Sequence, residues 1–269
     1  EVMAVEARYH SWKTGRNCLV LWAPNAGLAR DPRWGRTEEV FGEDPYLVAR
    51  LAVEEIKGMQ GDDPKYWRTA TVMKHFLANS NEDGRTYTSS DFDEALFRDY
   101  YSYGFWKGVV DGGSRSLMTA YNKYNGIPCS TNEFIQEILI DEWGMDGQIL
   151  NDGGALKQLV TLHKYVDDDK MAVKLSVEAG ITRILDQVSA EMKAAVEEGM
   201  LSEDIIDRNV RFNIRTMLRL GLMDDSDANP YKDVGFTDVA PWETDEYKAK
   251  ARLATQKSVV LLKNNGNLL

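Results

Sequence analysis

The 269-residue sequence is poor in the residues that build redox and metal sites. It contains only two cysteines, Cys18 and Cys129, which share no Cys-x-x-Cys spacing, and only three histidines. Zinc sites and disulfide frameworks need more of these residues at closer spacings, so we interpret both cysteines as buried or loop thiols. No stretch approaches the ~20 consecutive apolar residues of a membrane span, which predicts a soluble chain.

Positive charge is also scarce. Asp and Glu outnumber Lys and Arg by 43 to 32, and the basic residues are scattered with no run of four. A nucleic-acid partner favours a clustered basic surface, so none is expected. No signal peptide is recognisable, but the chain opens at Glu1 in a stretch that already has a helical pattern. We therefore expect the true start to lie upstream, which leaves secreted, periplasmic and cytoplasmic locations open.

Short apolar runs alternate with longer amphipathic stretches, a pattern typical of βα units around a mostly parallel sheet. The runs predict strands at 19–23, 70–73, 116–120, 148–150 and 181–185. Helices are expected at 45–60, 93–110, 132–142, 155–179, 189–198, 203–220 and 245–257. The helix at 45–60 is the best marked, with Asp44 as cap, Pro45 in the first turn and Gly61 as stop. Its predicted buried stripe consists of Leu47, Val48, Leu51, Ala52, Ile56 and Met59.

The composition changes after residue 222. Residues 223–244 are rich in Asp, Asn, Pro and Gly, which predicts a linker. A helix follows, and then the run Ser258 to Leu262, whose length suits a buried strand. A lone strand needs a partner, so we expect Asn264 to Leu269 to lead into a second domain. The predicted units are a main domain at 1–222, the linker at 223–244 and the start of another domain at 245–269.

The loops after the predicted strands carry unusual polar residues. In a parallel sheet or barrel such loops converge on one face, where catalytic residues gather. The loop of residues 30–44 holds Arg30, Arg33 and Arg36 together with Trp34 and Phe41. Arginine forks grip hydroxyl groups while an aromatic face covers an apolar ring, and a sugar offers both surfaces. We therefore expect a carbohydrate ligand.

Three further strand ends carry candidate residues whose roles stay open from position alone. Asp152 precedes two glycines, which suits a nucleophile, although a helix cap before Ala155 is the more frequent role. Lys74 and His75 would point to opposite faces of a regular strand, so both reach one pocket only if the strand ends there. The alternative is a surface lysine beside a core histidine. Tyr121 also fits a packing role.

Five motifs together resemble glycoside hydrolase family 3 in order and spacing. They are RDPRWGRTEEVFGEDP at 30–45, KHF at 74–76, MTAYN at 118–122, Asp146-Gly147 and NDGGA at 151–155. The tail SVVLLKN at 258–264 resembles the start of that family's second domain, an α/β sandwich. The resemblance covers nearly the whole chain. It implies a TIM-like (β/α)8 barrel, incomplete at the N-terminus, followed by the start of the sandwich domain.

The resemblance also implies roles for individual residues. Asp152 would be the nucleophile of an exo-acting, retaining β-glycosidase that acts on an oligosaccharide or β-glycoside and needs no cofactor or metal. The acid/base glutamate is expected in the second domain, which would complete the site. The implied sugar-binding residues are Arg36, Lys74 and His75 on hydroxyl groups, Tyr121 beside the nucleophile, Met118 in the pocket wall, and Arg85.

Several activities remain open. A β-glucosidase is expected first, with a β-xylosidase or another β-glycosidase as the alternative. Gly153 stands where many glucosidases of the family have tryptophan, which leaves the aglycone preference open. A non-catalytic sugar-binding homologue also fits, because no acid/base residue is found in this chain. A Schiff-base enzyme that uses Lys74 is a third hypothesis.

Overall fold

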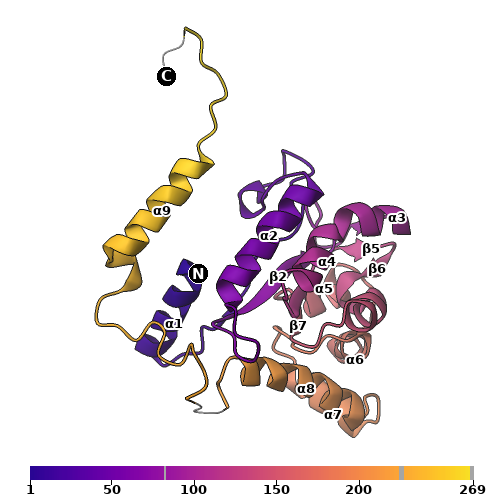
Figure 1. Ribbon diagram of the computed structural model, residues 1–269. Coiled ribbons are helices and arrows are strands. Elements are labelled where there is room, and N and C mark those ends of the chain that lie inside the picture. The colour runs from indigo at the N-terminus through magenta and orange to yellow at the C-terminus, as the bar shows by residue number, and fades with distance from the viewer. Residues whose placement is uncertain (82, 224–226, 267–269) are drawn as a thin grey trace.

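The computed structural model describes residues 1–81, 83–223 and 227–266 and contains a parallel sheet wrapped by helices (Figure 1). The sheet has the order β1-β2-β4-β7, with β1 at Val20–Leu21, β2 at Ala70–Phe76, β4 at Ser116–Thr119 and β7 at Ile149–Asn151. These strands confirm the predictions at 19–23, 70–73, 116–120 and 148–150. The strand expected at 181–185 is reduced to one parallel bridge between Leu150 and Arg183.

Helices follow and cover these strands. The α-helices are α1 (Val2–Thr14), α2 (Pro45–Gln60), α3 (Glu94–Leu96), α4 (Tyr103–Val110), α5 (Ala155–Thr161), α6 (Asp169–Ala179), α7 (Ser189–Glu197), α8 (Glu203–Arg219) and α9 (Asp245–Ser258). Short 3-10 turns lie at Thr37–Glu39, Cys129–Thr131 and Pro241–Glu243, and π-helical segments at Phe97–Tyr101 and Ile135–Glu142. A smaller sheet joins β3 (Ser89–Ser90), β5 (Lys123–Tyr124) and β6 (Ile127–Pro128).

The helix α2 begins and ends where the sequence predicts. The Asp44 carboxylate accepts a hydrogen bond from the Leu47 amide at 2.6 Å, and Gly61 follows the last turn with φ +81°. The predicted stripe was wrong at Leu47 and Leu51, which are 48% and 42% exposed. Because α2 packs against both β2 and α4, the helix is turned so that Ala49 and Val53 face inward instead.

The single helix expected at 155–179 was wrong. The chain instead forms α5 and α6, which pack side by side and are joined by residues 162–168. Lys164 in this connection has a left-handed backbone, with φ +51°. The Asp168 carboxylate then accepts a hydrogen bond from the Met171 amide at 2.8 Å and caps α6. The apolar residues keep a helical spacing across this connection, but the cap at Asp168 starts a new helix there.

An aromatic cluster forms the centre of the core beneath α2 and α4. Phe76, the last residue of β2, is fully buried, and the rings of Phe97, Phe105, Phe134 and Trp143 meet its ring edge to face with centroids 5.0–6.0 Å away. Edge-to-face contacts of this kind stabilise a core beyond the area they bury. They fix the end of β2, which carries Lys74 and His75.

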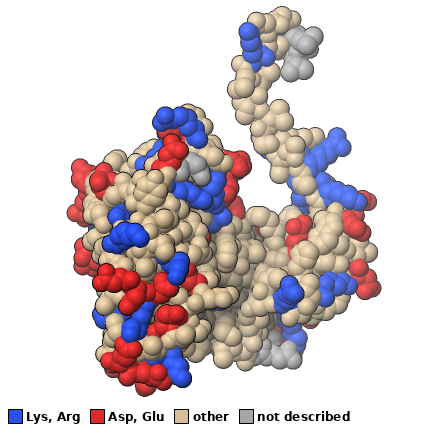
Figure 2. All heavy atoms as spheres, turned by 180° about the vertical axis from the view of Figure 1, so that it is seen from behind, with Lys and Arg blue, Asp and Glu red and all other residues tan. Residues whose placement is uncertain are grey.

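The C-terminal segment stands away from this body. α9 has no buried residue, and Val259, Val260, Leu261 and Leu262 are 60–91% exposed in extended backbone (Figure 1). Among the described residues no strand is formed at 258–262, and the buried strand expected there, which needs a partner from a second domain, stays a prediction. The predicted domain boundaries stay predictions. Figure 2 shows the segment projecting from the body, with acidic and basic side chains interspersed on the visible face.

We expect Phe76→Ala to lower the free energy of unfolding by about 3–5 kcal/mol, because it leaves a cavity inside the aromatic cluster. Urea denaturation of both proteins measures the difference. Tyr46→Ala is the matched control, since Tyr46 is 61% exposed and its loss should change the free energy by less than ~0.5 kcal/mol. A loss below ~1 kcal/mol for Phe76→Ala would contradict a central role for the cluster.

Candidate active site

The predicted site residues meet at the carboxyl edge of the parallel sheet. Phe76 on β2 is in register with Thr119 on β4, and Thr119 is in register with Asn151 on β7. His75 immediately precedes the first of these residues and Asp152 immediately follows the last, so both lie within one residue of this row at the carboxyl edge of the sheet. Carboxyl ends of parallel strands are where α/β folds place their ligands.

Lys74 and His75 both reach this edge, although β2 continues through Phe76. The register between β2 and β4 is irregular from Met73 to Phe76, which breaks the strict alternation of side chains. Lys74 Nζ lies 3.3 Å from Glu39 Oε2, and His75 Nε2 lies 3.5 Å from Asp152 Oδ2. An irregular strand, and not a strand end as predicted, therefore brings the two neighbours together.

The Asp152 carboxylate does not cap a helix. α5 begins after Gly154, whose φ of +84° makes it the cap residue, and this helix end has no side-chain cap bond. Asp152 Oδ1 instead accepts a hydrogen bond from the Gly153 amide at 2.8 Å, and Oδ2 faces His75. The side chain keeps 15% of its surface exposed. Of the two roles left open by the sequence, this geometry favours a carboxylate that is held for a ligand.

Opposing effects act on the Asp152 carboxyl group. Its burial raises the pKa above the usual aspartate value, because a carboxylate loses hydration there. The Gly153 amide, the Tyr121 hydroxyl and the charges of Arg36 and Arg85 act in the other direction and favour the ionised form. The site thus holds a carboxylate that is poorly hydrated yet stabilised by nearby donors.

The ring of His75 is neutral, so His75 adds no cation beside Lys74. Burial lowers the pKa of His75 to about 3, and the positive charges of Lys74 and Arg36 add to that effect. Its contact with Asp152 at 3.5 Å is therefore not an ion pair at neutral pH. The cationic groups that favour ionised Asp152 are Arg36 and Arg85.

Tyr121 completes the wall beside Asp152. Its hydroxyl donates a hydrogen bond to the Gly153 carbonyl at 2.7 Å, and Arg85 lies over its ring at 5.5 Å from the centroid. Burial, with the nearby Asp152 charge, raises the pKa of Tyr121 to about 12, so the phenol stays protonated and can donate. Arg85 thus lies beside Tyr121, and its role in sugar binding stays a prediction.

Met118 lies inside the sheet. It is 1% exposed and packs with Val72 and Leu150, so it supports the site from within and is nearly closed to solvent. A role in the pocket wall stays a prediction.

The family model of the glycosyl hydrolase family 3 N terminal domain matches residues 3–215. The chain belongs to this family. Its parallel sheet and surrounding helices accordingly belong to a TIM-barrel-like α/β fold, as the motifs predicted.

Relatives of two activities resemble this family 3 chain. "Beta-D-xylosidase 3" of Arabidopsis thaliana is 32% identical over 100% of the chain and 36% of its own length, and "Periplasmic beta-glucosidase" of Salmonella typhimurium is 33% identical over 90% and 32%. A solved exo-beta-xylosidase of the family has a TM-score of 0.90 at 28% identity, covering 99% of this chain and 35% of its own. A beta-glucosidase from Listeria innocua has a TM-score of 0.84 at 30% identity, with 100% and 38% covered. The chain thus spans about a third of the length of these proteins.

The arginine-rich loop of the family 3 domain does not present its aromatic residues to a ligand. Trp34 is 4% exposed and Phe41 packs against the core, so neither offers a free face to a sugar, and this part of the prediction was wrong. Arg30 donates hydrogen bonds to the Tyr101 hydroxyl and the Ala78 carbonyl, which anchor the loop. The aromatic rings are buried and not exposed as predicted, because large apolar side chains pack into the interior even when the residues around them form turns.

Two groups near the site were not predicted. Glu39 forms a bidentate ion pair with Arg36 at 2.6 and 2.8 Å and also contacts Lys74. The three-residue spacing of Arg36 and Glu39 was the available signal. The Asn151 amide donates to Asp186 at 2.6 Å and to the Asp152 carbonyl at 2.7 Å, which ties the backbone of Asp152 to the next segment. No local pattern indicates a contact across 35 residues.

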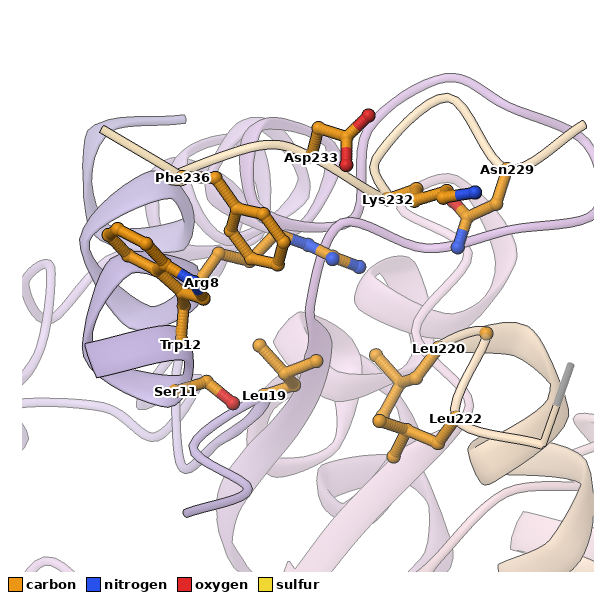
Figure 3. Close-up of a pocket in the computed structure, with 11 residues that line it drawn as sticks. Arg8, Ser11, Trp12, Leu19, Leu220, Leu222, Asn229, Lys232, Asp233 and Phe236 are labelled. Carbon is orange, nitrogen blue, oxygen red and sulfur yellow. The ribbon is translucent and has the colours of Figure 1, made fainter. Parts of the chain in front are cut away.

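A cavity of about 310 Å³ lies elsewhere, between α1 and residues 220–222 and 229–236 (Figure 3). Trp12, Leu19, Leu220 and Phe236 line it. Leu19 precedes β1, so this cavity belongs to the amino edge of the sheet and contains none of the predicted site residues. Among the described residues, no group of His, Cys, Asp and Glu forms a metal-binding cluster. In the same part of the chain, the helices are too short or too polar to cross a bilayer.

We expect Arg85→Met to raise the pKa of Asp152. A nearby cation favours the carboxylate, so its removal favours the protonated acid and moves the titration to higher pH. An NMR titration of the labelled Asp152 carboxyl carbon measures this directly. Arg33→Met is the control, because the Arg33 side chain is 89% exposed and pairs with Asp31. A shift to lower pH, or an equal shift in both variants, would contradict the assignment.

Proposed function

We propose that the protein to which this chain belongs is a retaining, exo-acting β-glycosidase, and first of all a β-glucosidase. The observation that carries the proposal is the carboxylate of Asp152, which caps no helix and is surrounded by Arg36, His75, Arg85 and Tyr121. Membership of glycosyl hydrolase family 3 supports the reaction class. The activities in the names of its relatives support a β-glycosidic bond as the bond that is cleaved.

The proposed reaction is a double displacement. An oxygen of Asp152 attacks the anomeric carbon while the bond to the leaving-group oxygen breaks, and a general acid protonates that oxygen. Water then cleaves the resulting glycosyl ester and restores the Asp152 carboxylate. In this second step the general acid of the first step, now ionised, acts as the base that takes a proton from the water. Poor hydration of Asp152 strengthens it as a nucleophile, and nearby Arg36 and Arg85 keep it ionised.

The general acid is proposed to lie in the remainder of the protein. Glu39 is the described glutamate that contacts site residues, but its hydrogen bonds from Arg36 lower its pKa to about 2. A carboxyl group that is ionised throughout the neutral range cannot donate a proton to a leaving group. The retaining mechanism instead requires a carboxyl group roughly 5–5.5 Å from Asp152.

β-Xylosidase activity is the second candidate. It is supported by the relatives named as xylosidases, of which one spans the whole chain at 32% identity. Xylose differs from glucose by the missing hydroxymethyl group, so the choice depends on contacts to that group. The Schiff-base hypothesis is disfavoured, because Lys74 is ion-paired with Glu39 and the reaction needs a free amine.

The space beside Asp152 has room for a bulky leaving group. A Cβ atom placed on Gly153 meets no atom within 4 Å among the described residues. A tryptophan at this position would form a wall there, and Gly153 leaves the side open. We propose that aglycones with wide or branched rings are accepted.

A 2-deoxy-2-fluoro β-glucoside should label Asp152 in the full-length protein. The fluorine slows both steps, and with a good leaving group the covalent ester accumulates. Peptide mass spectrometry locates the label. Asp152→Asn should abolish it and lower kcat by roughly a thousandfold or more. Label on any other residue would refute Asp152 as the nucleophile.

Asp168→Asn is the matched control for that variant. Asp168 is also an aspartate that follows a loop, but its carboxylate caps α6, and asparagine caps equally well. We expect normal labelling and normal kcat. Loss of activity in both variants would point to a general effect of the substitutions on folding.

A panel of nitrophenyl glycosides tests the substrate. If the first proposal is right, kcat/KM is highest for the β-glucoside, because contacts to the hydroxymethyl group add to transition-state binding. A higher value for the β-xyloside would select the second candidate. Binding of the sugars without any turnover by the full-length protein would instead support a non-catalytic homologue.

A further inference from the structure

Glu39 is placed between the cationic residues of the site. Its two carboxylate oxygens accept hydrogen bonds from Arg36 Nε at 2.6 Å and Nη2 at 2.8 Å, and Oε2 also lies 3.3 Å from Lys74 Nζ. The side chains are partly enclosed, with 32% of Glu39, 23% of Arg36 and 20% of Lys74 exposed. One anion thus binds two cations that come from different parts of the chain.

Local structure fixes Glu39 in this position. It is the last residue of the 3-10 turn Thr37–Glu39, whose first side chain donates a hydrogen bond to the Trp34 carbonyl at 2.8 Å. Trp34 is itself buried, so the turn is anchored in the protein interior. Glu39 therefore offers its charge from a fixed support, whereas Lys74 and Arg36 have long, flexible side chains.

We propose that Glu39 is a positioning residue, which holds Arg36 and Lys74 in the orientation needed to bind the hydroxyl groups of the terminal sugar. This inference rests on the proposed function. Two neighbouring cations repel each other and would turn toward solvent in the absence of an anion. Glu39 offsets that repulsion and fixes both donors before the sugar arrives, so less side-chain freedom is lost on binding.

The charge of Glu39 is suited to this role over a wide pH range. Its hydrogen bonds from Arg36 keep the pKa at about 2, so the carboxylate persists wherever Asp152 is ionised. Among the described residues, the Glu39 carboxylate bonds to Arg36 and Lys74 and not to Asp152. It therefore acts on the sugar through Arg36 and Lys74, and its removal should weaken ground-state and transition-state binding alike.

A second ion pair in the same loop provides a matched comparison. Asp31 accepts bidentate hydrogen bonds from Arg33 at 3.0 and 2.6 Å, so the pair resembles that of Glu39 with Arg36. The Arg33 side chain is 89% exposed, so this pair lies mostly in solvent, whereas the pair of Glu39 and Arg36 is partly enclosed beside Lys74. The two pairs differ in their relation to the site, and not in their chemistry.

The test compares Glu39→Gln and Asp31→Asn in the full-length protein. We expect Glu39→Gln to raise KM roughly ten- to a hundredfold with a smaller change in kcat, because it removes charge-assisted hydrogen bonds that orient the sugar-binding groups. Asp31→Asn should leave KM unchanged. With deoxy sugars that lack the hydroxyl groups bound by Arg36 and Lys74, the penalty of Glu39→Gln should disappear, which a general structural defect would not produce.

Glu39→Asp and thermal unfolding complete the test. The shorter acid keeps the charge, and we expect it to recover part of the lost KM; if Glu39→Gln does not fold, Glu39→Asp decides by the same comparison of KM. An unchanged KM in a folded Glu39→Gln protein, or an equal penalty on all deoxy sugars, overturns the proposal. If the unsubstituted protein hydrolyses no glycoside, the proposed function fails, whereas calorimetric binding of glucose and xylose to the same variants still tests Glu39.

Discussion

The parallel register of β2, β4 and β7 is the constraint on which the site depends. Phe76, Thr119 and Asn151 lie side by side across the sheet, and each is next to a residue or loop of the candidate site. The buried ring of Phe76 holds this row in place through its aromatic neighbours. A shift of one strand by a single residue would turn the side chains to the opposite face and separate His75 from Asp152.

Charge balance is the second constraint, and it follows from the first. Asp152 is buried enough to lose hydration, and Arg36, Arg85 and the Gly153 amide compensate for that loss. Glu39 in turn limits the positive charge of Arg36 and Lys74. His75 is neutral among these groups because it is buried, and the charges of Lys74 and Arg36 further disfavour a cation there. The site is thus a network in which the charge of each residue depends on its neighbours.

Much of the fold could be predicted because it depends on local patterns. The cap at Asp44, Pro45 in the first turn and Gly61 at the end define α2 within the sequence itself. Prediction failed where distant contacts decided the outcome. The orientation of α2 that exposes Leu47 and Leu51 is set by α4. The break between α5 and α6 is a different case, because it follows a local cap, the Asp168 carboxylate on the Met171 amide, which apolar periodicity alone does not reveal.

The sequence by itself determined the family and the residues that stand at strand ends, since motifs such as KHF and NDGGA are contiguous stretches of chain. Only the tertiary structure decided that Asp152 caps no helix, that His75 is neutral and that Trp34 is buried. It also brought Glu39 to Lys74 across 35 positions. The physical reason is that burial and charge are properties of neighbours in space, and a sequence orders neighbours only along the chain.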